Sequence, residues 1–149
     1  MIRDQQWLES LLKNIWHEHF HDIEIHAPLK IQFGRRARNR LGSISYNHQQ
    51  KFAVIRLTGL FKDTNIPVMV ISATIVHELC HYAHGFAGGN ERKHALPHKG
   101  GVIRREFAER GLEDLYLAQK RWLNANWPKI IKKYYPHLQF RGTRHSRTF

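Results

Sequence analysis

The chain has 149 residues, a formal net charge of +12 at pH 7 and a single cysteine. This length suits one domain with its own hydrophobic core and is too short for two. One cysteine excludes an intrachain disulfide framework and any CxxC zinc ribbon. No stretch approaches the ~20 apolar residues of a membrane span, and residues 1–4 do not open a signal peptide. We therefore expect a cytoplasmic or nucleoid-associated protein with no membrane partner.

The first third of the sequence predicts one helix and a small sheet. Residues 6–16 carry an apolar stripe at helical spacing. Residues 29–33, 41–46 and 52–57 are short strand-like runs, and the last of them follows a turn-like segment at residues 47–50. Strands beside helices predict an α+β fold, with a small antiparallel sheet packed on helices. An edge strand of such a sheet is suited to hold an extended peptide by strand addition.

The most informative stretch of the chain is the motif His77-Glu78-Leu79-Cys80-His81. It continues an apolar run at residues 67–76, which begins with a proline suited to the first turn of a helix. Two histidines four residues apart lie on the same helix face and can bind one metal ion, and the glutamate between them can act as a general base. Cys80 faces away from the two histidines by helical phase, so we expect it to be a small core residue.

A catalytic zinc site needs a third protein ligand and keeps one position open for water. His98 is the favoured ligand, because it follows Pro97 and precedes a Gly-Gly pair at the start of a new amphipathic helix. A histidine at the entrance of a helix that packs back on the motif is well placed to close the site. The alternatives are two carboxylates further along this helix, which would give a gluzincin-type site, and two other histidines: Glu106, Glu109, His84 and His94.

The last third of the sequence predicts two helices and a basic tail. The amphipathic helix that begins at residue 102 is followed by another over residues 112–127, and Pro128 and Pro136 mark the end of regular packing. We therefore divide the chain into a zinc metallopeptidase domain at residues 1–128 and a basic, aromatic tail at residues 129–149.

The basic residues are concentrated in two segments. Arginines cluster just before the second strand, and lysines and arginines alternate with aromatic residues in the tail. Such a mixture suits a phosphate backbone with stacking on unpaired bases, although a solvated basic surface has the same composition. The residues that we expect to contact non-specific DNA, single-stranded or structured, are Arg35, Arg36, Arg38, Arg40, Lys132, Lys133, Arg141 and Arg144.

The order of these parts resembles the SprT-like zinc metallopeptidases, relatives of the eukaryotic Spartan protease. The resemblance is carried by the basic segment at residues 35–42, which reads as a hairpin, by residues 55–58, by the motif at residues 74–81 and by a distal histidine near a helix start. It implies a zincin-like metallopeptidase core with three histidines as zinc ligands, a glutamate base and proteolysis of DNA-associated proteins.

Carried over onto this chain, the family pattern makes His77, His81 and His98 the zinc ligands and Glu78 the catalytic base. The chain departs from the family in two places. Position 102 is Val102, where many relatives have an aromatic residue, and the C-terminal zinc ribbon of many relatives cannot form with one cysteine. The chain thus resembles a minimal member.

The function that these patterns favour is a zinc-dependent endopeptidase with a polypeptide substrate. The tetrahedral intermediate needs a further donor, for which Tyr82, His84 and the arginines of residues 35–40 are candidates. Three other functions fit part of the evidence. They are a nucleic-acid-binding zincin-like module without proteolysis, a zinc hydrolase of small amides, and a gluzincin-type peptidase with Glu106 or Glu109 as the third ligand.

Overall fold

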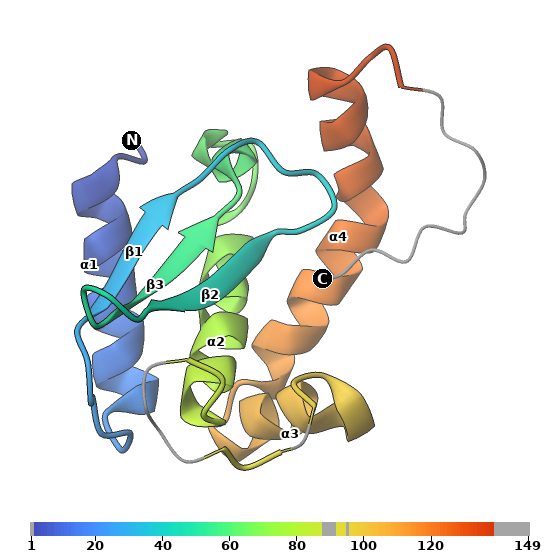
Figure 1. The fold of residues 1–149 in the computed structure, drawn as a ribbon. Coiled ribbons are helices and arrows are strands. Elements are labelled where there is room, and N and C mark those ends of the chain that lie inside the picture. The colour runs from blue at the N-terminus through green and yellow to red at the C-terminus, as the bar shows by residue number, and fades with distance from the viewer. Residues whose placement is uncertain (1, 88–91, 95, 139–149) are drawn as a thin grey trace.

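A computed structural model describes residues 2–87, 92–94 and 96–138 of the chain. Within these residues the fold is α+β, with a three-stranded sheet and four α-helices (Figure 1). The elements, in chain order, are α1 (Gln5–Ile15), β1 (Leu29–Phe33), β2 (Gly42–Asn47), β3 (Phe52–Leu57), α2 (Val68–Ala83), α3 (Val102–Glu109) and α4 (Glu113–Tyr134). A π-helical turn, Trp16–Phe20, extends α1. None of the described helices is long and apolar enough to cross a lipid bilayer.

The sheet is mixed, so the expectation of an antiparallel sheet was wrong. Its strand order is β1-β3-β2; β1 pairs with β3 in parallel and β2 pairs with β3 antiparallel. The connection from β1 to β2 crosses the position that β3 later fills, so β1 and β2 are not neighbours. The basic segment at residues 35–40 lies in this crossing connection and is not a hairpin. The hairpin is instead formed by β2 and β3, where the Asn47 side chain accepts hydrogen bonds from the backbone of Gln49 and Gln50.

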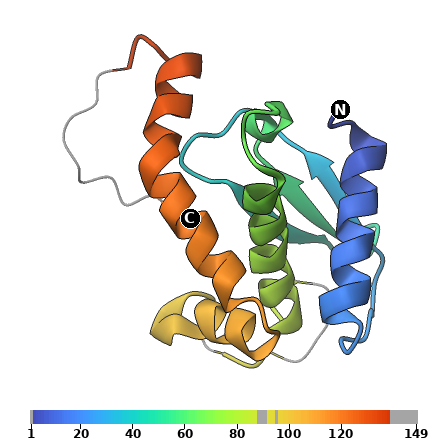
Figure 2. The same cartoon turned by 180° about the vertical axis from the view of Figure 1, so that it is seen from behind.

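Helices α1 and α2 cover one face of the sheet, as the view from behind shows (Figure 2). Helix α2 is apolar on almost every side, because it is enclosed by the sheet, α1, α3 and α4. Its fully buried residues include Ile71, Ile75 and Leu79. Gln119 of α4 donates hydrogen bonds to the Val70 carbonyl and the Thr74 hydroxyl of α2. The rigid placement of α2 fixes the direction in which its two motif histidines point.

Helix α4 continues through Pro128 to Tyr134, so the predicted end of regular packing at Pro128 was wrong. Proline removes the backbone donor for the carbonyl of Asn124, and Asn124 lies on the exposed face, where water can replace that donor. Burial of Ile130 and Ile131 against the rest of the core holds the helix together beyond the proline. The division of the chain at residue 128 stays a prediction, and residues 139–149 of the expected tail lie outside the described residues.

The carboxylate of Asp63, in the connection between β3 and α2, anchors the end of α4. Lys133 Nζ and the Tyr134 hydroxyl both donate to Asp63 Oδ2 at 2.7 Å. Burial raises the pKa of Asp63, but these hydrogen bonds outweigh it and the pKa falls to about 2. The buried guanidinium of Arg3 binds the same connection through the carbonyls of Phe61, Asp63 and Ile66.

Asp63→Asn is expected to lower the free energy of unfolding by about 1 kcal/mol at pH 7. The reason is that Lys133 and Tyr134 donate weaker hydrogen bonds to a neutral amide than to a carboxylate. Because the folded pKa lies below the ordinary value, this stabilisation is present above pH ~4 and is lost as the pH falls toward 2. Urea unfolding of both proteins at pH 7 and pH 2.5 checks the prediction. A difference between wild type and variant that is equal at both pH values would contradict it.

Candidate metal centre

Three histidine side chains converge at one end of α2. His77 and His81 are four residues apart on the same helix face. The Nε2 atom of His98 lies 3.1 Å from Nε2 of His77 and 3.0 Å from Nε2 of His81. Histidine, cysteine, aspartate and glutamate side chains are the usual metal ligands, and among those in the described residues these three histidines form the group that lies close enough together to hold a metal ion. The structure thus brings His98 to the motif histidines, as the sequence predicted.

The approach of His98 depends on the tight turn that follows it. Lys99–Gly101 form one 3-10 turn that leads into α3. Gly100 and Gly101 have φ values of 76° and 68°, in the left-handed region that favours glycine. The Gly-Gly pair therefore allows the chain to reverse immediately after His98, so that α3 can pack on α2 while the histidine faces the motif.

The spacing of the three nitrogens fits a shared metal ion. Two nitrogens bonded to one zinc at about 2.0–2.1 Å in tetrahedral geometry lie about 3.3 Å apart, close to the observed 3.0 and 3.1 Å. Each imidazole nitrogen offers either one proton or one lone pair. A proton on His98 Nε2 can serve only one of its two neighbours, whereas a cation among the three nitrogens can be bound by all three lone pairs.

The protonation of the cluster also suits metal binding. Burial, reinforced by the neighbouring imidazoles, lowers the pKa of His77 to about 3 and that of His81 to about 4. Burial likewise lowers the pKa of His98, with a contribution from Arg40. All three rings are therefore neutral near pH 7, and neutral imidazole is the form that ligates a metal.

The alternative third ligands lie elsewhere. Glu106 accepts hydrogen bonds from His84 Nε2 and from Arg110 Nε, each at 2.8 Å, so its carboxylate is held by groups away from the histidine cluster. His94 contacts the ring of His84, with ring centroids 4.5 Å apart. Glu109 is exposed and does not line the cavity beside the cluster. Neither the carboxylates nor these histidines join the three Nε2 atoms.

Glu78 is buried, with 6% of its surface exposed, and lines the same cavity as the three histidines. Burial raises its pKa to about 8, and Arg40 opposes this shift; a dication at the histidines would further favour the carboxylate. Gly42, at the start of β2, allows this close packing. A Cβ atom at Gly42 would lie 3.3 Å from Glu78 Oε2 and 2.8 Å from the Thr74 side chain. Any larger residue at this position would push against the carboxylate.

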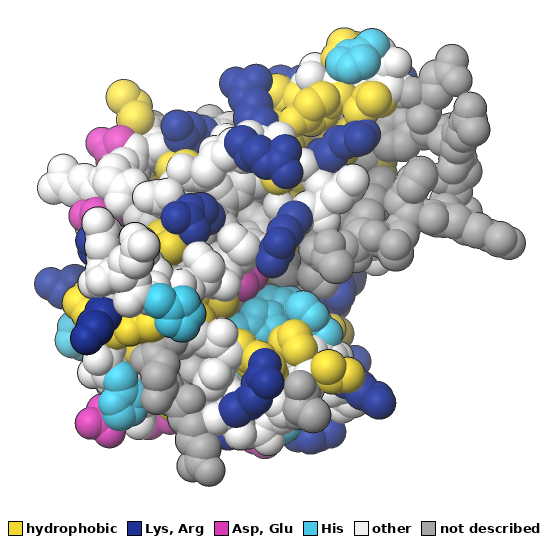
Figure 3. Space-filling view, in the orientation of Figure 1, with side chains coloured by type: hydrophobic (Ala, Val, Ile, Leu, Met, Phe, Trp, Pro, Cys, Tyr) yellow, Lys and Arg dark blue, Asp and Glu magenta, His cyan; other side chains and the backbone are white. Residues whose placement is uncertain are grey.

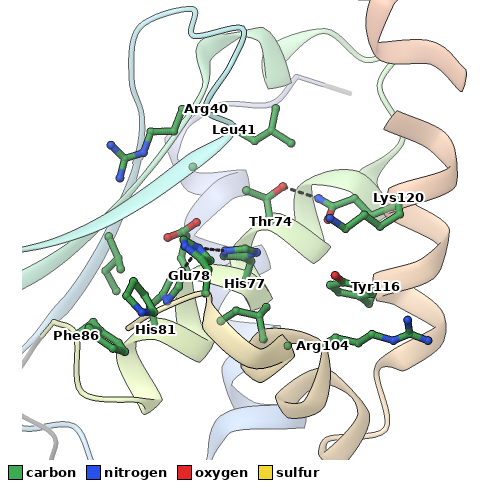
Figure 4. Close-up of a pocket in the computed structure, with 17 residues that line it drawn as sticks. Arg40, Leu41, Thr74, His77, Glu78, His81, Phe86, Arg104, Tyr116 and Lys120 are labelled. Carbon is green, nitrogen blue, oxygen red and sulfur yellow. Dashed lines mark hydrogen bonds between the residues drawn. The ribbon is translucent and has the colours of Figure 1, made fainter. Parts of the chain in front are cut away.

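The cluster opens into a cavity of about 630 Å³ between β2, α2, α3 and α4. Figure 3 shows histidine side chains gathered in a hollow of this face, with Lys and Arg side chains around it. Figure 4 shows Tyr116 and Lys120 of α4 on the side of His77, and Phe86 on the side of His81. Among the described residues, three Lys or Arg side chains line the cavity: Arg40, Arg104 and Lys120.

The sequence did not identify Tyr116 and Lys120 as cavity residues, because their segment reads as a core helix. A signal was nevertheless present, since Tyr116, Gln119 and Lys120 have the i, i+3, i+4 spacing of one helix face. That face contains polar and charged groups at positions where a purely structural helix would bury apolar ones. It indicates a wall that is exposed to a cavity.

The proposed donors for the tetrahedral intermediate separate into two groups. Tyr82 is fully buried against Trp16, with ring centroids 6.0 Å apart, and does not line the cavity. His84 is held by Glu106, as described above. Arg40 does line the cavity. Cys80 is fully buried, as predicted from helical phase.

The basic segment before β2 lies against the end of α4. Trp127 Nε1 donates to the Arg38 carbonyl at 2.8 Å, and the Tyr135 hydroxyl donates to the Arg36 carbonyl at 2.6 Å. The exposed side chains of Arg35, Arg36 and Arg38 are thereby brought near the part of α4 that carries Lys132 and Lys133. Lys133 is paired with Asp63. Arg141 and Arg144 lie outside the described residues, and DNA contact by this surface stays a prediction.

The cleft combines three neutral imidazoles, a buried carboxylate and cationic walls. The three histidines lie close enough together to bind a metal ion. No protein-family model, curated protein or solved structure matches this chain.

Proposed function

We propose that this protein is a zinc-dependent endopeptidase with a zincin-like core. The observation that carries the proposal is the convergence of His77, His81 and His98 beside the buried carboxylate of Glu78. All four residues line one cavity. The Cys80 thiol is buried, which leaves the cavity without a sulfur nucleophile among its described lining residues.

The residues divide the chemistry between them. His77, His81 and His98 would hold a zinc ion, which would supply Lewis acidity to lower the pKa of water and polarise a carbonyl group. Glu78 accepts the proton of the attacking water and delivers it to the departing amine. Arg40 and Tyr116 line the same cavity and are our candidates for the group that stabilises negative charge on the carbonyl oxygen.

The shape of the cleft supports a polypeptide substrate. Strand β2 is an edge strand of the sheet, since it pairs with β3 on one side only. Gly42 and Ile44, at the beginning of this strand, and Leu41, which directly precedes it, line the cavity. An extended peptide can therefore add to the free edge of β2 with its backbone across the histidines. A small amide would need only a closed pocket and would leave this strand edge unused.

The resemblance to SprT-like metallopeptidases agrees with this assignment and suggests nucleic-acid-associated proteins as substrates. The exposed arginines at residues 35–38 beside the end of α4 support a polyanion-binding surface. A nucleic-acid-binding module with a purely structural metal is the second candidate. Glu78 argues against it, because a structural site has no use for a buried carboxylate, which costs folding free energy.

Zinc-loaded protein is expected to cut an unfolded protein, such as reduced and alkylated casein, at internal bonds. Mass spectrometry of the products gives the new N-termini. Short acylated amides of single amino acids serve as the comparison, since they reach the metal but cannot pair with β2. Rapid hydrolysis of these amides without cleavage of casein would favour the small-amide hydrolase. Binding of single-stranded DNA with no hydrolysis of either would favour the module without proteolysis.

A further inference from the structure

Gln119 of α4 is a polar side chain in the cavity wall. It is buried, with 6% of its surface exposed, and it lines the same cavity as the three histidines. Its Nε2 atom donates to the Val70 carbonyl at 2.9 Å and to the Thr74 hydroxyl at 2.8 Å. Its Oε1 atom accepts no hydrogen bond from the described residues, and yet this atom is not sealed from solvent. The free oxygen of Gln119 therefore faces the cavity.

The two hydrogen bonds of Nε2 fix the orientation of the Gln119 amide. The Val70 carbonyl can only accept a hydrogen bond, so the Gln119 atom that faces it must be the nitrogen. The Thr74 hydroxyl donates its own proton to the same carbonyl at 2.8 Å, so this hydroxyl accepts from Gln119. Both protons of the –NH₂ group are thus used inside the protein. The amide presents an acceptor to the cavity and cannot turn over without losing both bonds.

Thr74 places this acceptor close to His77 and Glu78. Thr74 and Glu78 are four residues apart on α2 and share one helix face. A Cβ atom at Gly42 would meet both side chains, so both lie against the start of β2. Figure 4 shows Thr74, with its bond to Gln119, beside His77 and Glu78. One helical turn rises about 5.4 Å and two residues of an extended peptide span roughly 6.8 Å, so the acceptor lies within about two residues of a bond held at the histidines.

An extended peptide in this cavity carries donors that need such an acceptor. When a peptide adds to the free edge of β2, alternate residues turn their N–H and C=O groups toward that strand. The N–H groups between them point away from β2 and into the cavity, and α4 forms part of the cavity wall. An N–H group that loses water there without finding a partner weakens binding. The lysine and arginine side chains of the wall can only donate hydrogen bonds, so they cannot satisfy it.

From these placements, and on the basis of the proposed endopeptidase function, we infer that Gln119 is a substrate-binding residue. Its Oε1 atom accepts a hydrogen bond from one backbone N–H of the substrate, within about two residues of the scissile bond. The bonds to Val70 and Thr74 hold the acceptor in place before the substrate binds, so little side-chain freedom is lost on binding. Because the contact is made with the backbone, it adds affinity for polypeptides without selecting a side chain.

A backbone ester scan tests the inference. An ester in place of one amide removes the N–H without adding bulk, and it is moved through the two residues on each side of the scissile bond. The kcat/KM for cleavage of the scissile amide, with products identified by mass spectrometry, is measured for zinc-loaded wild type, Gln119→Met and Asn126→Leu. Methionine has about the length of glutamine and no amide. Asn126→Leu is the matched control, because it also removes an amide of α4 that donates to a backbone carbonyl, and Asn126 does not line the cavity.

At one position of the scan, the amide-to-ester ratio of kcat/KM is expected to be about tenfold larger in wild type and Asn126→Leu than in Gln119→Met. At the other positions the three proteins are expected to give equal ratios. Each ratio compares two substrates on the same protein, so a smaller folded fraction in a variant cancels. A merely structural role of Gln119 would lower kcat/KM for both substrates alike and leave the ratio unchanged.

If circular dichroism shows that Gln119→Met is unfolded, Gln119→Glu replaces it. A carboxylate accepts a hydrogen bond more strongly than an amide, so the ratio at the one position is then expected to exceed that of wild type. Equal ratios in wild type and in the Gln119 variant at every position would overturn the inference but leave the peptidase assignment intact. Failure of the wild type to cut any peptide would overturn the peptidase assignment itself.

Discussion

His98→Ala is expected to abolish stoichiometric zinc binding and leave the fold intact. His98 supplies one of three converging Nε2 atoms, and its own side chain is exposed, outside the hydrophobic core. Loss of a residue that only hydrogen-bonds to a metal ligand already lowers metal affinity by about 10–100-fold. Loss of a direct ligand is expected to exceed this, because two imidazoles on one helix then hold the ion without a third donor.

The zinc content of purified protein, after dialysis against a buffer with submicromolar free zinc, measures this effect. His94→Ala is the matched control. It removes a histidine from the same loop, but the ring of His94 contacts His84 and not the histidine cluster. Circular dichroism shows whether each variant is folded. One zinc per chain in wild type and His94→Ala, with none in His98→Ala, is the expected result. Zinc retained in His98→Ala but lost in Glu106→Ala would instead assign the third ligand to the gluzincin type.

Glu78→Gln is expected to lower kcat by about 10²–10⁴-fold, the usual contribution of a general base. Glutamine has nearly the same shape as glutamate, so the packing against Gly42 and Thr74 is preserved. Since burial raises the pKa of Glu78 to about 8, the carboxylate is disfavoured in its protein surroundings. The neutral amide should therefore leave the stability of the protein equal or slightly higher.

The rate of peptide cleavage and the zinc content must be measured on the same sample of Glu78→Gln. Full zinc with almost no cleavage supports the role of Glu78 in proton transfer. Zinc-dependent cleavage at the wild-type rate would show that Glu78 has no catalytic role. Loss of zinc together with activity would show that the carboxylate supports the metal rather than the proton transfer.

The elements that could be predicted from sequence are those with a local pattern. The range of β3 and the apolar helix that leads into the motif follow from periodicity and from Pro67, which caps α2. The parallel pairing of β1 with β3 could not be predicted in this way. It depends on where the connection between β1 and β2 crosses the sheet, and no residue of that connection specifies the crossing locally.

The site shows the same division between local and long-range information. The four-residue spacing of His77 and His81 is a property of one helix, and the Gly-Gly pair after His98 signals a turn. Tyr116 and Lys120 were missed because their place beside the cluster depends on how α4 packs on α2. The length of α4 was underestimated because tertiary packing of Ile130 and Ile131 outweighs the helix-breaking tendency of Pro128.

The proposed peptidase function requires one metal ion, held by His77, His81 and His98, for the hydrolysis of peptide bonds. The most direct measurement is a titration of chelator-treated protein with zinc, in which the cleavage rate of an unfolded protein substrate is followed at each addition. The rate is expected to rise linearly and to level off at one zinc per chain. Cleavage that persists in the chelator-treated protein, or fully zinc-loaded protein that cleaves nothing, would contradict the claim.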